Sequence, residues 1–193
     1  MGYFRMKKFR RFLLWCIFIF LILFLLRGWL FRKVNYYTST GPRDYTSSPS
    51  PELIQWIDQH TKDIKPEISD IIDESLHLAA DQLAFTTEKC ETDPNKLFLS
   101  HKTNCIGYAA FFSTVCNQMI KENKLQQQWI ATPHIGQLYF FGINIHPYFK
   151  SKFWKDHDFV LVENKMTGER IAVDPSLYDY SGITTVRYKK ESR

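Results

Sequence analysis

Glycine is scarce in this sequence, and glycine-rich phosphate loops are missing from it. Only eight glycines occur among 193 residues, and none of them lies in a G-x-x-x-x-G-K or G-x-G-x-x-G arrangement. Loops of those kinds let backbone N–H groups surround the phosphates of a nucleotide. The sequence therefore gives no support for nucleotide binding, and we expect no cofactor.

Pairs of metal ligands are missing as well. The chain has four cysteines and six histidines, but they form no C-x-x-C or H-x-x-x-H pair of the kind that holds zinc. His101 and Cys105 stand four residues apart and offer the one rival use of that cysteine, with no second pair to complete a site. We expect no metal.

Basic charge is missing from most of the chain, although the net charge is +5. Eight of the 25 Lys and Arg fall within residues 1–33, which contain no acid, so 17 basic residues face 20 acidic ones in the remainder. A nucleic-acid-binding domain needs a basic surface. We therefore expect no nucleic-acid partner, and the basic character belongs to the N-terminus.

One long apolar run is present, close to the N-terminus. Residues 12–26 are fifteen consecutive apolar side chains, which as a helix cover ~22 Å of a hydrocarbon core ~30 Å thick. Arg27 can reach out of that core, and Trp29 suits its surface. We predict a transmembrane span over residues 12–31 that contacts the lipid bilayer.

The sequence around this run predicts its orientation. No small-x-small cleavage site follows it, which favours an uncleaved signal anchor over a cleaved signal peptide. Five Lys or Arg precede the apolar run of residues 12–26, and Arg27, Arg32 and Lys33 follow it. By the positive-inside rule, residues 1–11 form a basic cytoplasmic tip and the rest of this single-pass protein is extracytoplasmic, either periplasmic or extracellular, in the cell envelope.

The segment after the span is rich in Ser, Thr and Pro, short of aliphatic residues and without periodicity. Such a composition is typical of a tether, so we predict a linker over residues 32–50 and a folded domain over residues 51–193. Pro51 and Pro66 each open a helix in this interpretation.

The stretch TNCIGYAAFF places Cys105 at the start of a helical pattern. Apolar residues recur on one helix face from Cys105 to Ile120, including Cys116. Asn104 or Thr103 can cap the helix, so Cys105 lies in its first turn, where free N–H groups and the positive end of the dipole favour a thiolate. The helix alone leaves open whether Cys105 is a nucleophile or a buried core thiol. For Cys116 we expect a buried core thiol.

After residue 124 the pattern changes to strands. Residues 128–132, 137–145, 157–164 and 170–175 read as strands of an antiparallel sheet, with a hairpin turn at residues 163–170. His157 opens one strand of this hairpin and Asp174 ends the other, so the two side chains are expected to be neighbours. Asp158 and Asp179 are the alternatives for the acid, while Asp156 and Asp158 are expected to be solvated charges.

Cysteine at a helix start, then histidine and aspartate on adjacent strands, is an arrangement that activates a thiol nucleophile. In these residues the sequence resembles the transglutaminase-like superfamily, through Cys105 in TNCIGYAAFF, His157 in DHDFVLVEN and Asp174 in IAVDPSLYD. The resemblance covers roughly residues 95–180. It implies an α+β, papain-like fold in which Cys105, His157 and Asp174 are catalytic. Phe159 stands where many relatives have Trp.

The resemblance implies acyl transfer at an amide carbonyl of a peptide or protein substrate, through a thioester on Cys105. If water attacks the thioester, the protein is a cysteine peptidase or amidase. If an amine attacks it, the protein is a transamidase. We expect hydrolysis, because water is abundant and nothing marks an amine pocket. The alternative is a catalytically inactive tethered scaffold that binds a protein or glycan through the aromatic loop of residues 139–154.

Two details of the expected site stay open in the sequence. The second oxyanion donor has three candidates, Asn104, His101 and Asn95. Cys105 and Cys116 are ~16 Å apart by helix rise, beyond the ~7 Å that a disulfide spans, so any disulfide outside the predicted membrane span must involve Cys90. Pairing of Cys90 with Cys116 would leave Cys105 free.

Overall fold

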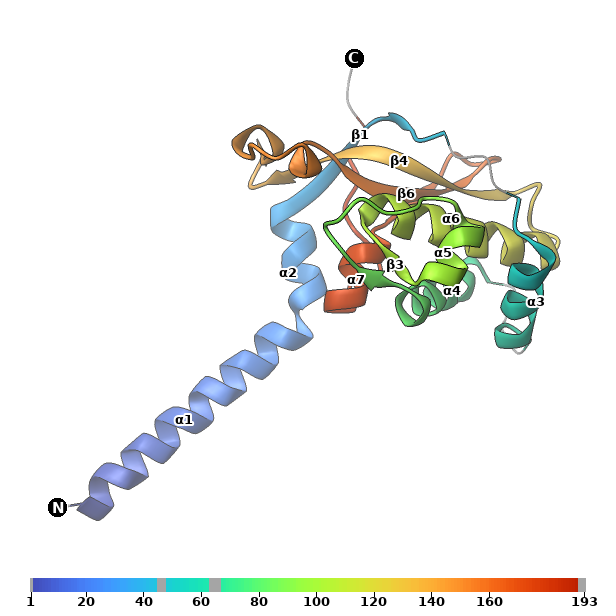
Figure 1. Ribbon diagram of the computed structural model, residues 1–193. Coiled ribbons are helices and arrows are strands. Elements are labelled where there is room, and N and C mark those ends of the chain that lie inside the picture. The colour runs from blue at the N-terminus through green and yellow to red at the C-terminus, as the bar shows by residue number, and fades with distance from the viewer. Residues whose placement is uncertain (1, 45–47, 63–66, 191–193) are drawn as a thin grey trace.

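The computed structural model describes residues 2–44, 48–62 and 67–190, with residues 2–8 and 152 described by their backbone alone. It has the expected α+β class, with helices packed on an antiparallel sheet (Figure 1). The helices are α1 (Gly2–Leu25), α2 (Arg27–Val34), α3 (Pro51–His60), α4 (Ile68–Gln82), α5 (Pro94–Ser100), α6 (Cys105–Glu122) and α7 (Pro175–Ser181), with the 3-10 turns η1 (His146–Tyr148) and η2 (Lys152–Trp154). The strands are β1 (Asn35–Pro42), β2 (Ala84–Phe85), β3 (Lys102–Thr103), β4 (Trp129–Phe140), β5 (Ile143–Asn144), β6 (His157–Asn164) and β7 (Arg170–Val173).

Three helices begin with a polar cap followed by proline. Ser50, Asp93 and Asp174 precede the first residues of α3, α5 and α7, and each accepts a backbone N–H bond with its side chain. Proline suits the next position because its missing N–H would have no partner there. The predicted helix start at Pro51 is confirmed, whereas Pro66 lies outside the described residues and α4 runs from Ile68.

The main sheet has the strand order β1-β4-β6-β7, and β5 pairs with the end of β4. The strands expected over residues 128–132 and 137–145 are joined through Pro133 into one long strand, β4, which ends at Phe140, and residues 143–144 form the separate strand β5. The Arg43 N–H donates to the Pro133 carbonyl at 2.8 Å, so the backbone polar groups of Pro133 point to the β1 side of β4. The missing N–H of Pro133 therefore removes no bond to β6.

The predicted hairpin between β6 and β7 is confirmed. The Asn164 side-chain oxygen accepts from the N–H groups of Met166 and Thr167, and Gly168 has the positive φ of 74° that the turn needs. This turn fixes the register of the two strands, in which Val160 pairs with Val173. The register brings the first residue of β6 close to the end of β7.

Helix α6 is the central element of the core. It packs against α4 on one side and against β4 and β6 on the other (Figure 1). Its buried side chains include Phe111, Phe112 and Cys116, all fully buried, which confirms Cys116 as a core thiol. On the other face of the sheet, Tyr37 and Phe159 belong to a smaller cluster covered by the C-terminal segment.

The structure differs from the prediction of a linker over residues 32–50. Residues 35–42 form strand β1, which pairs along β4 from Asn35↔Phe140 to Pro42↔His134. Residues 48–50 are also held, because Asn95 bonds to the backbone of Ser48 and Ser50. The tether interpretation is wrong for residues 35–42, since aromatic and β-branched side chains outweigh the missing aliphatic ones there.

The N-terminal apolar run is a helix that breaks at Leu26. Among the described residues no single helix is long and apolar enough to cross a membrane; the bent pair Phe9–Leu25 and Arg27–Val34, at 64°, passes by length and composition. The Arg27 Nε donates to the Ser181 carbonyl at 2.5 Å, and so Arg27 joins α2 to the end of α7. The predicted span over residues 12–31 stays a prediction.

Candidate active site

Cys105 is the first residue of α6, where the sequence placed it. The Asn104 side chain caps this helix by accepting the Ile106 N–H at 3.0 Å, and only 6% of Cys105 is exposed. Free N–H groups in this turn favour a negative charge on the sulfur. The first turn of α6 lies directly against Thr103 of β3. Only glycine fits at position 107, because a Cβ there would lie 1.8 Å from the Thr103 hydroxyl.

His157 is the first residue of β6, and it meets Asp174 as expected. His157 Nε2 lies 2.7 Å from Asp174 Oδ2, and 22% of the histidine side chain is exposed. A carboxylate only accepts, so Nε2 carries the hydrogen and Nδ1 is the ring nitrogen left for other partners. The Cys105 thiol is near enough to His157 to interact with it electrostatically, and the structure thus brings together all three residues of the predicted triad.

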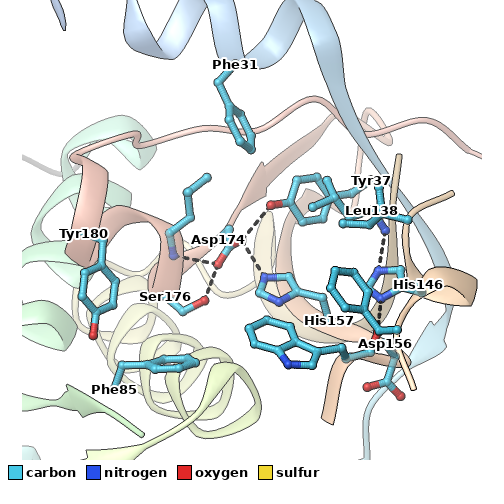
Figure 2. A pocket seen from close by; sticks show the side chains of 14 residues that line it. Phe31, Tyr37, Phe85, Leu138, His146, Asp156, His157, Asp174, Ser176 and Tyr180 are labelled. Carbon is cyan, nitrogen blue, oxygen red and sulfur yellow. Dashed lines mark hydrogen bonds and ion pairs between the residues drawn. The ribbon is translucent and has the colours of Figure 1, made fainter. Parts of the chain in front are cut away.

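Asp174 is held by four donors, and its side chain is 1% exposed. Besides His157, the Tyr37 hydroxyl donates to Oδ2 at 2.8 Å, while the Ser176 hydroxyl and the Leu177 N–H donate to Oδ1 at 2.8 and 3.0 Å (Figure 2). Burial would raise the pKa of Asp174, but His157 and these bonds outweigh it and lower the pKa. The carboxylate stays ionised.

The pKa of His157 is raised well above its ordinary value. Burial is the largest influence and acts to lower the pKa, but it is outweighed by the Asp174 carboxylate, by the bond to Asp174 and by the nearby Cys105 side chain. The imidazolium form is therefore stabilised between a carboxylate and a thiol. A proton that leaves Cys105 has an acceptor at His157.

Arg43 and Asp158 form a buried ion pair near the triad. Arg43 Nη2 lies 2.7 Å from Asp158 Oδ1, Nε bonds to the other oxygen, and the Asp158 side chain has no exposure. The expectation that Asp158 is solvated is wrong, because its carboxylate points inward from β6. Asp156 fits that expectation better: its side chain is 42% exposed and 4.0 Å from Arg43. Arg43 also interacts electrostatically with Cys105.

Asp179, the other alternative acid, has a different partner. It accepts from the Tyr108 hydroxyl at 2.7 Å, within the helical layer formed by α6 and α7. The three candidate oxyanion donors are also engaged locally. Asn95 holds the backbone of residues 48–50, and the His101 ring lies 3.0 Å from the Gln82 carbonyl. Asn104 caps α6 with its side-chain oxygen, so this bond does not use the NH2 group that an oxyanion donor needs.

The four cysteines are free thiols. The Cys90 sulfur lies 3.5 Å from the Thr103 hydroxyl, beside the strand that leads into Cys105. Burial raises the pKa of Cys116 to about 12, so this thiol is inert in the folded protein. Over residues 2–44, 48–62 and 67–190, no three His, Cys, Asp or Glu side chains are grouped as a metal site.

His146 was not singled out in the sequence, yet it fixes the aromatic loop. Its Nδ1 lies 2.7 Å from the Trp154 carbonyl and its Nε2 accepts from the Leu138 N–H at 2.9 Å. One nitrogen must donate and the other accept, so both ends of a neutral ring are used. Tyr37 and Arg43 were also missed, because the segment that contains them had been interpreted as a linker. The run NYYTST, rich in β-formers, was the available signal.

A cavity of about 460 Å³ opens beside His157 and Asp174 (Figure 2). Its walls come from α2, β1, β2, β4, the aromatic loop and α7, and they are mostly aromatic or aliphatic. The aromatic members are Phe31, Tyr37, Phe85, Phe149, Trp154 and Tyr180. A volume of this size is typical of a small-molecule or side-chain binding site.

Comparison with protein-family models, curated protein sequences and solved structures found no match for this chain. The assignment of its site therefore depends on the residues and their geometry.

Proposed function

We propose that this chain is a membrane-anchored thiol enzyme with transglutaminase-like, papain-like architecture, which transfers an acyl group through a thioester on Cys105. The observation that carries the proposal is the Cys105–His157–Asp174 constellation, built from the start of α6, the start of β6 and the residue after β7. A core thiol needs neither an imidazole partner nor a buried carboxylate behind it.

In this proposal the Cys105 thiolate attacks an amide carbonyl carbon, and the C–N bond breaks after the tetrahedral stage. The amine leaves with the proton held by His157, and Asp174 keeps the imidazole in the required orientation. Water then adds its hydroxyl to the thioester, and its proton passes through His157 to the leaving thiol. Hydrolysis is preferred to transfer onto an amine, because water is abundant and the cavity wall beside His157 is mostly apolar, with Asp156 as its partly exposed carboxylate.

The predicted span over residues 12–31 gives the membrane anchor of the proposal. Support comes from the large exposed fractions of the apolar side chains on α1, such as 68% for Phe9 and 64% for Trp15. Exposed apolar surface of this extent is stable in lipid and not in water. The domain would lie on the extracytoplasmic side.

A direct test is alkylation of Cys105 in the full chain carrying Cys16→Ala and Cys90→Ser, with Cys116 left in place because it is fully buried. Near pH 6 we expect iodoacetamide to react roughly tenfold or more faster than in the same chain with His157→Ala, since a thiolate–imidazolium pair depends on the histidine. Alkylation is also compared between Asp174→Asn and Asp179→Asn, where Asp179→Asn is the matched control at an acid outside the triad. Equal rates with and without His157 would contradict the proposal.

A second candidate is a scaffold that binds a protein or glycan through the aromatic loop. It is favoured by the exposure of Phe141 and Tyr148, at 70% and 76%. The same alkylated protein separates the two functions. A scaffold keeps its partner when Cys105 is blocked, whereas the thiol enzyme loses all turnover.

A further inference from the structure

The cavity beside His157 and Asp174 offers a ligand few free polar groups. The Tyr37 and Ser176 hydroxyls both donate to Asp174, and both nitrogens of His146 are bonded to the backbone. The other polar groups on the wall are those of Asp156, whose side chain is 42% exposed, Trp154 and Tyr180, and apart from His157 the rest is aromatic and aliphatic surface. A peptide backbone would bring many N–H and C=O groups that need partners, and a wall with so few polar groups would leave most of them unpaired. The cavity therefore suits a hydrocarbon group.

One wall of the cavity comes from the membrane-proximal helix. Phe31 points from α2 into the cavity (Figure 2). Arg27 and Arg32 hold α2 on the domain through bonds to the carbonyls of Ser181 and Thr185. Helix α2 is separated from α1 by Leu26 alone. The cavity thus lies next to the point where the apolar helix leaves the domain.

The rim of the cavity carries exposed apolar side chains on the same side of the domain as α2. The β4–β5 turn touches α2, since the Phe141 N–H donates to the Val34 carbonyl at 2.8 Å. In this turn and the aromatic loop, Phe141, Ile143 and Tyr148 are more than half exposed, and Phe149 on the cavity wall is 40% exposed. The end of β4 and the loop that follows it lie at the same end of the domain as α2 and α1 (Figure 1). Exposed patches of this kind mark contact with lipid or a partner.

We infer that the cavity binds the hydrocarbon chain of a fatty acyl group taken from the bilayer, with the acyl carbonyl toward His157. The inference rests on the proposed function and names its substrate class as an N-acyl lipid or N-acylated peptide. Cys105 forms a C–S bond to the acyl carbon, the C–N bond breaks after the tetrahedral stage, and the amine takes the proton from His157. Water then adds its hydroxyl to the acyl carbon and releases the fatty acid, and the proton from that water passes through His157 to the Cys105 sulfur.

The experiment measures binding and not turnover, so that it is independent of the proposed chemistry. The full chain with Cys105→Ala is placed in phosphatidylcholine nanodiscs with palmitic acid that carries a diazirine on its chain. After irradiation, labelled peptides are located by mass spectrometry. We expect saturable labelling of residues 145–156 and of α7. Labelling of α1 is expected to rise linearly with the probe and reports its delivery to the bilayer.

Matched variants locate the binding. Phe149→Glu places a charge on the cavity wall and is expected to lower saturable labelling roughly tenfold. Leu99→Glu makes the same kind of change at a side chain that is 76% exposed and outside the cavity, and is expected to have no effect. Leu138→Trp, which fills the cavity from β4, is expected to act like Phe149→Glu.

Two results would overturn the inference. One is labelling of residues 145–156 that does not saturate or does not respond to Phe149→Glu. The other is displacement of the probe by an apolar peptide as effectively as by palmitate, which would assign the cavity to peptide side chains. Either result leaves the proposed thiol chemistry to its own test, because Cys105 alkylation does not depend on what fills the cavity.

Discussion

The buried carboxylate of Asp174 is shared by three elements that are far apart in the sequence. Tyr37 comes from β1, His157 from β6, and Ser176 and Leu177 from α7. Asp174 is also the residue that caps α7. One side chain therefore fixes the imidazole and begins a helix, and its hydrogen bonds offset the cost of burying its charge.

Tyr37→Phe tests how much this network stabilises the domain. The hydroxyl is a buried donor to a charged acceptor, so its removal is expected to lower the free energy of unfolding by roughly 1.5 to 3 kcal/mol. Urea unfolding of the full chain in detergent micelles, followed by near-UV circular dichroism, measures the change. Tyr36→Phe is the control, because Tyr36 stacks on Tyr139 at 4.7 Å and we expect an effect within about 0.5 kcal/mol. Equal stability of the two variants would mean that the Tyr37 bond contributes nothing.

At the scale of elements, the position of Cys105 depends on how closely α6 approaches β3. Gly107 lies against the buried side chain of Thr103, and no other residue type fits there without a shift. Helical glycine is normally replaceable by alanine at a gain. Close approach is the reason why this one is not.

Gly107→Ala is accordingly expected to destabilise the protein by roughly 1 to 3 kcal/mol and to slow Cys105 alkylation near pH 6, because the first turn of α6 must move. Gly28→Ala in α2 is the matched control, since the nearest atom to its new Cβ is the tip of Arg32 at 3.3 Å. Adding Thr103→Ala to Gly107→Ala is expected to restore part of both losses. If Cys105 in Gly107→Ala is alkylated at the wild-type rate, the contact between Gly107 and Thr103 does not position the cysteine.

The elements that the sequence predicted are those whose signals are local. The helix from Cys105 follows from its cap and apolar face, and the β6–β7 hairpin from its turn residues, so the His157–Asp174 contact could be derived. The pairing of strand β1 could not be derived, because its partner β4 lies about a hundred residues away; the β-forming run NYYTST indicated a strand but not its partner. The role of His146 also depends on contacts that exist only after the loop has folded.

At the scale of the whole molecule, the folded domain begins before residue 51, where the sequence analysis placed its start. Helix α2 and strand β1 are joined to the C-terminal segment by Arg27, by Arg32 and by the backbone of Tyr37, which bonds to Arg187 and Lys189. The break at Leu26 is thus the point at which the chain passes from the exposed apolar helix to the folded domain. The site is completed by Tyr37 and Arg43, which lie within the segment expected to be a linker, so its geometry depends on that segment.

Two truncated chains test whether the folded domain needs α2 and β1 or begins at residue 51. A chain of residues 26–193 keeps α2, β1 and the Tyr37–Asp174 bond, and we expect a folded protein with cooperative urea unfolding. A chain of residues 46–193 loses Tyr37 and Arg43, exposes the edge of β4 over much of its length and leaves Asp158 as a buried, unpaired carboxylate. Such a charge is strongly destabilising, and an uncovered edge strand promotes aggregation. Gel filtration and near-UV circular dichroism of both chains decide the matter, and equal folding of the shorter chain would return β1 to the status of a dispensable tether.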